Sequence, residues 1–98
     1  MTSVPIRRVA VVGSGVMGRG IAITFAKSGF KVSLVSRDPG GVKELPSAIS
    51  VVSEPPVDPA PDLVIESIPE RLDLKQSLFR RLDELYAGRS ILASNTSG

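Results

Sequence analysis

The stretch Arg8-Val9-Ala10-Val11-Val12-Gly13-Ser14-Gly15-Val16-Met17-Gly18 decides how this chain folds. Residues 9–12 form a short apolar run, which is typical of a strand buried on both faces. Glycines occupy three of the next six positions, and apolar residues then recur with helical spacing until Gly29 ends the pattern. A second strand is predicted over Lys31–Ser36. Together these segments form one βαβ unit of about 30 residues.

The rest of the sequence predicts three more strands and one more helix. The strands are expected over 48–53, 62–67 and 90–94, and a helical apolar stripe runs from Leu74 to Tyr86. Residues 54–61 include four prolines in eight positions, so they are expected to form an extended connector.

The length of this connector fits one topology. Extended, it spans about 27 Å, which is enough to cross three strand spacings, whereas a helix of the same length spans about 12 Å. We therefore expect an α/β fold over residues 1–98. It is a compact or truncated Rossmann-like parallel sheet of about five strands in the order 3-2-1-4-5, with helices on both faces.

The three glycines of the turn have separate roles. Gly13 permits a tight exit from the strand, Gly15 lets the backbone approach a phosphate group, and Gly18 lets the helix pack closely against the strand. The helix that begins near Val16 directs unpaired N–H groups and the positive end of its dipole at the same point. Because this pattern follows a strand and opens a helix, it favours a nicotinamide-dinucleotide site over a mere packing turn. The residues expected to bind the cofactor here are Gly13, Ser14, Gly15, Val16, Met17 and Gly18.

The residues after the second strand indicate which dinucleotide binds. An acidic side chain at this position accepts a hydrogen bond from the adenosine ribose of NAD, but this sequence has Ser36 followed by Arg37. A hydroxyl beside a guanidinium would instead donate hydrogen bonds to the 2′-phosphate of NADP. The cofactor is therefore expected to be NAD or NADP, with a slight preference for NADP. The alternative is that Asp38 accepts from the ribose and that Arg37 is solvated.

Composition excludes several other classes of function. The 98 residues carry a formal net charge of +2, and 42% are hydrophobic and 22% charged, as in an ordinary globular domain. With so small a charge and no apolar run near 18 residues, neither nucleic acid nor a membrane is an expected partner. Cysteine and histidine are both absent from the sequence, which removes the Ser/His/Asp triad and most zinc sites, so no metal is expected. A cytoplasmic location is the default expectation.

Three stretches resemble the NAD-binding domain of the 3-hydroxyacyl-CoA dehydrogenase family. They are residues 11–22 with the glycine turn, Asp62-Leu63-Val64-Ile65-Glu66-Ser67-Ile68-Pro69-Glu70, and Ser94-Asn95-Thr96-Ser97. The resemblance implies an oxidoreductase of fatty acid metabolism, which transfers hydride between C3 of a 3-hydroxyacyl-CoA and NAD or NADP.

The resemblance also implies roles for single residues. Glu70 and Lys75 would contact the nicotinamide half of the cofactor, while Ser97, with Asn95 on the same loop, would orient the 3-oxygen of the substrate. Each role has an alternative. Ser67 and Glu70 have capping-box spacing, Lys75 alone would be a solvated lysine on the exposed side of the helix, and Ser97 alone would be a loop serine.

Two departures from the family pattern limit the expected activity. Only Arg37–Ser47 fills the gap between the second and third strands, where the family has a long helical excursion that contributes to acyl-CoA binding. The family's histidine base and its helical C-terminal domain, which closes the substrate site and usually dimerises, are expected to be absent. Glu66 and Glu70 are the carboxylates near the predicted site, and neither matches a family base. The chain by itself is therefore expected to be inactive, with 3-hydroxyacyl-CoA as a partner only if a C-terminal domain is supplied.

Two other functions stay open. One is a non-catalytic module that binds or senses a dinucleotide, which the missing histidine favours. The other is the cofactor domain of a 3-hydroxyacid dehydrogenase or imine reductase, whose serine-bearing loops differ from residues 94–97. In either case an open sheet edge is expected where a sixth strand would pair, so the chain is expected to self-associate through that edge.

Overall fold

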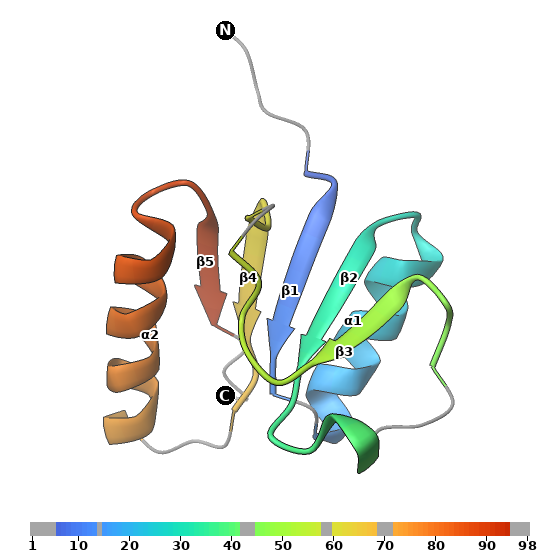
Figure 1. The fold of residues 1–98 in the computed structure, drawn as a ribbon, viewed down its shortest axis with the longest axis horizontal. Helices are drawn as coiled ribbons and strands as arrows, with labels where there is room; N and C mark the ends of the chain where they lie inside the picture. Colours follow the sequence, from blue (N-terminus) through green and yellow to red (C-terminus); the bar gives the residue numbers. More distant parts are fainter. Residues whose placement is uncertain (1–5, 14, 42–44, 58–59, 69–71, 95–98) are drawn as a thin grey trace, which may run out of the picture.

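The computed structural model describes residues 6–13, 15–41, 45–57, 60–68 and 72–94. Five strands form one parallel sheet in the order β3-β2-β1-β4-β5, which confirms the predicted topology (Figure 1). Within these ranges, no helix is long and apolar enough to cross a membrane. The elements are β1 Arg8–Val12, α1 Val16–Lys27, β2 Lys31–Val35, a turn of 3-10 helix Pro39–Gly41, β3 Ile49–Val52, β4 Leu63–Glu66, α2 Leu72–Tyr86 and β5 Ile91–Ser94.

The register brings the carboxyl ends of the strands together at one edge of the sheet. Val12 at the end of β1 lies opposite Val35 of β2 and Glu66 of β4, and Ser94 at the end of β5 also lies opposite Glu66. Successive strands run outward from β1 to β3, and the chain then crosses back to β4. Open parallel sheets bind ligands at such a reversal, outside the carboxyl ends of the strands.

The two helices cover opposite faces of the sheet, because side chains alternate between the faces along each strand. Val9 and Val11 of β1 share a core cluster with Ala22 of α1, whereas Val12 shares one with Tyr86 of α2. Figure 1 shows α1 behind β2 and β3, and α2 beside β5. The uninterrupted apolar run of β1 predicts that helices pack against both faces of the sheet.

The proline connector, residues 54–61, joins β3 to β4 across the two strands between them. Its described part contains no helix or strand, as its prolines predict. The phenol of Tyr86 donates a hydrogen bond of 2.7 Å to the carbonyl of Pro56. This tyrosine is almost fully buried, and burial raises the pKa of its hydroxyl. The connector therefore crosses the sheet on the α2 face and is fastened there by a buried hydroxyl.

Asp62 ties β1 to β4 at the opposite edge of the sheet. Its carboxylate accepts hydrogen bonds from the backbone N–H groups of Arg7 and Arg8, at 2.9 and 3.0 Å. These two bonds are the main reason that the pKa of Asp62 lies below its ordinary value of 3.8. Folding therefore favours the ionised carboxylate.

We expect Asp62→Asn to lower the free energy of unfolding by about 1 kcal/mol near neutral pH, because a neutral acceptor replaces a charged one. The carboxylate stabilises the fold only while it is ionised. The difference should therefore be complete above about pH 4 and shrink as the pH falls through the lowered pKa of folded Asp62. Urea unfolding of both proteins at several pH values measures it. A difference that stays constant down to about pH 2 would contradict this role.

Candidate functional site

The turn after β1 begins with a glycine that tolerates no side chain. Gly13 has a φ of 114°, a conformation that L side chains rarely adopt. A Cβ there would overlap the carbonyl group of Ser67, whose own N–H donates to the carbonyl of Val12 at 2.8 Å. The N–H of Gly13 donates to the carbonyl of Val35 at 3.0 Å. The exit from β1 is therefore packed against the exit from β4.

Gly18 brings α1 against the same point. A Cβ on Gly18 would overlap the carbonyl oxygen of Gly13 and lie 3.6 Å from the Cβ of Ser67. A side-chain rotation does not relieve the first clash, because the obstacle is backbone. Gly13 and Gly18 therefore have the turn and packing roles that the sequence predicts.

The first turn of α1 faces open space. Gly15 precedes the helix without a side-chain cap, and an added Cβ at Gly15 would meet no atom within 4 Å. Val16 and Met17, the first helical residues, are 90% and 57% exposed. The first turn contains no acidic residue, so its N–H groups can donate to an external anion, which the positive end of the dipole attracts. This geometry fits a phosphate group; Ser14 lies outside the described residues.

The residues after β2 differ in their surroundings. Ser36 is buried, its N–H donates to the carbonyl of Val52 at 2.8 Å, and its hydroxyl accepts from the N–H of Asp38 at 3.1 Å. Arg37 and Asp38 are exposed. The carboxylate of Asp38 lies against Gly41, where an added Cβ would be 2.5 Å from Oδ2. The Ser36 hydroxyl therefore shapes the turn, while Arg37 beside it is exposed to solvent.

An ion pair joins the end of β4 to α2. Glu66 is fully buried, and its Oε1 lies 3.6 Å from Nζ of Lys75, whose side chain is 12% exposed. The other carboxylate oxygen, Oε2, accepts from the N–H of Ile68 at 2.6 Å. The expectation that Lys75 lies on the exposed side of the helix is therefore wrong, because a buried carboxylate draws the ammonium inward. Because the protein covers Glu66 completely, its carboxylate is also out of reach of a substrate proton.

The sequence contains one signal for this pair. Glu66 is the one carboxylate in the otherwise apolar strand 63–66, and a buried charge needs a partner. The sequence pattern does not identify the partner, because Lys75 follows nine positions later, in a different element. Helical periodicity describes each element separately and does not show which residues meet across elements.

Three further predicted residues, Glu70, Asn95 and Ser97, lie outside the described residues. Their roles in contacting the cofactor and the substrate stay predictions. The backbone of Ser94 is paired in register with Glu66, so β5 leads the chain to the same edge as β4.

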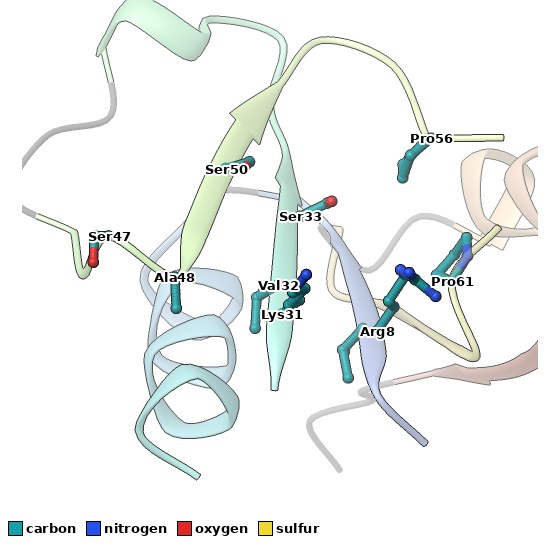
Figure 2. Close-up of a pocket in the computed structure, with 10 residues that line it drawn as sticks. Arg8, Lys31, Val32, Ser33, Ser47, Ala48, Ser50, Pro56 and Pro61 are labelled. Atoms are coloured by element: carbon teal, nitrogen blue, oxygen red, sulfur yellow. The ribbon is translucent and has the colours of Figure 1, made fainter. Parts of the chain in front are cut away.

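A hollow of about 440 Å³ lies on the α2 face of the sheet, toward the amino ends of β1 and β2. Figure 2 shows Ser33 of β2 and Ser50 of β3 on its sheet side, Pro56 and Pro61 of the connector across from them, and Arg8 extending toward Pro61. The hollow exists because an extended connector, rather than a helix, crosses this part of the sheet. None of the described cofactor candidates lines it.

Comparison with known proteins agrees with this geometry. A family model described as "3-hydroxyacyl-CoA dehydrogenase, NAD binding domain" matches residues 8–55 and 42–98. The 3-hydroxybutyryl-CoA dehydrogenase of Clostridioides difficile is 33% identical over 115 aligned positions, covering 92% of this chain and 41% of that protein. A 5-formyl-3-hydroxy-2-methylpyridine 4-carboxylate 5-dehydrogenase of Mesorhizobium japonicum is 30% identical over 117 positions, covering 95% and 38%.

A solved structure shows the same fold. The (S)-3-hydroxybutyryl-CoA dehydrogenase PaaH1 of Ralstonia eutropha superimposes with a TM-score of 0.82 at 29% identity, covering 95% of this chain and 42% of that one. The chain thus spans about two fifths of the length of these relatives. Alignments of 115 and 117 positions exceed the 98 residues present, so the relatives contain residues without a counterpart here. By its sequence, its sheet order and its glycine turn, this chain belongs to the family of 3-hydroxyacyl-CoA dehydrogenase NAD-binding domains.

Proposed function

We propose that this chain is the cofactor-binding part of an oxidoreductase that transfers hydride between C3 of a 3-hydroxyacyl-CoA and NAD or NADP. The observation that carries the proposal is the open, uncapped start of α1, held against the ends of β1 and β4 by Gly13 and Gly18. The names of the dehydrogenases from Clostridioides difficile and Ralstonia eutropha support the thioester substrate. The name of the Mesorhizobium japonicum relative contains a pyridine instead of a thioester, so relatives of this chain differ in substrate class. Dinucleotide binding and substrate class are therefore tested separately.

In this proposal the bound nicotinamide supplies or accepts the hydride, while the protein provides orientation and electrostatics. Backbone N–H groups of Gly15, Val16 and Met17 would donate to the pyrophosphate. Residues at the end of β2, on one side of β1, would hold the adenosine half. On the other side of β1, toward β4 and β5, Glu70 and Lys75 would contact the nicotinamide half.

The remainder of the active site is proposed to come from residues outside this sequence. The chain spans 38% and 41% of two relatives' lengths, and its 98 residues contain no histidine to act as a base. Ser97 and Asn95 would orient the substrate oxygen from this side of the site. A second candidate function, a module that binds a dinucleotide without catalysis, is favoured by the same missing histidine. Both functions need the site at the start of α1.

We expect Gly15→Ala to weaken NADH binding by about tenfold, equivalent to about 1.4 kcal/mol, while the chain stays folded. The new methyl group would meet no atom of the protein within 4 Å, and the φ of −68° suits alanine. It would, however, occupy the space through which the pyrophosphate approaches the backbone. NADH fluorescence titration gives the affinity, and thermal unfolding reports on the fold.

Gly20→Ala is the matched control, because a Cβ at Gly20 also meets no atom within 4 Å but lies more than one turn further along α1. This variant should bind NADH as the original chain does. If Gly15→Ala binds NADH as tightly as the control does, the pyrophosphate does not lie against this turn.

We further propose that NADP is accepted, and slightly preferred, through Arg37. A guanidinium at the end of β2 can form charge-assisted hydrogen bonds with a 2′-phosphate. The Ser36 side chain is buried whereas Arg37 is exposed, so Arg37 would provide most of the preference. The exposed Asp38 is the competing group, because its carboxylate would accept from the ribose of NAD and repel a phosphate.

Arg37→Gln should weaken NADPH binding by about fivefold to tenfold and leave NADH binding within about twofold, because only NADPH carries the 2′-phosphate. Asp38→Asn is the companion variant, which should weaken NADH selectively if the aspartate is the ribose acceptor. Separate titrations with the two reduced cofactors measure both effects. A preference of the original chain for NADH of about tenfold or more would refute the NADP proposal.

The open edge of β5 supports a proposal of self-association. Within the described residues, β5 pairs only with β4, and Ile91 on this strand is 59% exposed. Unpaired edge N–H and C=O groups beside an apolar side chain favour pairing with a second chain. We expect the apparent mass in sedimentation to rise with protein concentration, and Ile91→Lys to suppress the rise. A mass that stays monomeric at high concentration would contradict association through this edge.

A further inference from the structure

The ion pair between Glu66 of β4 and Lys75 of α2 is buried, unlike an ordinary ion pair on a protein surface. Glu66 is fully buried, and the Lys75 side chain is 12% exposed. Burying two charges costs free energy that their mutual attraction rarely exceeds, so such pairs are weak contributors to stability. A buried pair at the edge of the sheet that binds ligands therefore suggests a role beyond folding.

The two oxygens of Glu66 have different partners. Oε2 accepts from the N–H of Ile68 at 2.6 Å, which fixes the chain as it leaves β4. Oε1 faces Nζ of Lys75 at 3.6 Å. In the sheet, Glu66 lies beside Val12, the residue before the glycine turn. One carboxylate thus sets the position of an ammonium group relative to the turn at Gly13.

The ammonium of Lys75 has few partners among the described residues. Its Nζ is buried and has no hydrogen-bond acceptor within that part of the chain. At 3.6 Å the attraction to Glu66 is electrostatic, because this separation is too long for a good hydrogen bond. A buried ammonium has three N–H donors, and donors without acceptors destabilise a folded protein. An acceptor that enters the site would satisfy these donors.

We propose that Glu66 is a positioning residue for the dinucleotide, which holds the Lys75 ammonium so that it donates to hydroxyl groups of the sugar on the nicotinamide side. The inference rests on the proposed function. Strand order supports this side of the site: with the adenosine half at β2 and the pyrophosphate at α1, the remaining sugar lies toward β4. Glu66 itself does not contact the ligand, because it is covered by the protein.

The test compares two ligands that share the adenosine and the pyrophosphate. NADH includes the second sugar, whereas ADP lacks it. Glu66→Gln keeps the size of the side chain and an acceptor for Ile68, but it removes the charge that holds Lys75. We expect this variant to bind NADH about tenfold more weakly and ADP within about twofold of the original chain. A residue with only a structural role would weaken both ligands equally.

Lys75→Met should show the same selective loss, because it removes the ammonium and keeps the apolar stem. In the double variant the loss should equal that of Lys75→Met alone, since Glu66 acts through the lysine. Equal losses for NADH and ADP, or additive losses in the double variant, would overturn the inference. Unchanged NADH binding by Lys75→Met would overturn it even if Glu66→Gln does not fold.

Binding of NADH and ADP by the unsubstituted chain distinguishes failure of this inference from failure of the proposed function. If it binds neither NADH nor ADP, the proposed function fails and the inference fails with it. If it binds both and only the selective loss is missing, the site at α1 stands and the role of Glu66 is refuted.

Discussion

The backbone contact between Gly18 and Gly13 is the constraint on which the rest of the structure depends. Neither glycine has room for a Cβ, because each is packed against another backbone segment. The start of α1, the exit from β1 and the exit from β4 are therefore packed as one unit around Gly13 and Ser67. This packing holds an uncapped helix N-terminus at the point where the strand order reverses, so its free N–H groups and its dipole act on one small volume.

The proline connector completes the sheet without an additional helix between β3 and β4. An extended segment crosses the sheet from β3 to β4, and Tyr86 fastens it through a buried hydrogen bond to Pro56. As a result, part of the α2 face stays open over Ser33 and Ser50, whose hydroxyl groups are compatible with solvent. This opening lies toward the amino ends of the strands. The short connector therefore does not alter the opposite edge of the sheet, where the glycine turn lies.

Much of the fold could be predicted because its signals are local. The apolar run before Gly13 indicates a strand buried on both faces, and the reach of the connector selects the strand order. The site was less predictable because its side chains meet across elements. Periodicity placed Lys75 on the solvent side of α2, yet Glu66 of β4 draws it inward. The sequence predicts that the Ser36 hydroxyl donates to a phosphate, but this hydroxyl also accepts from the N–H of Asp38, a contact that depends on the turn geometry.

The most direct test of the central claim is an NMR titration of the ¹⁵N-labelled chain with ADP, which follows every backbone amide separately. If the pyrophosphate binds at the start of α1, the amides of Gly15, Val16 and Met17 should show the largest shifts and saturate together. The account would be contradicted if these three amides stayed unchanged at saturating ADP while others, such as those of Ser33 and Ser50 beside the hollow, shifted instead.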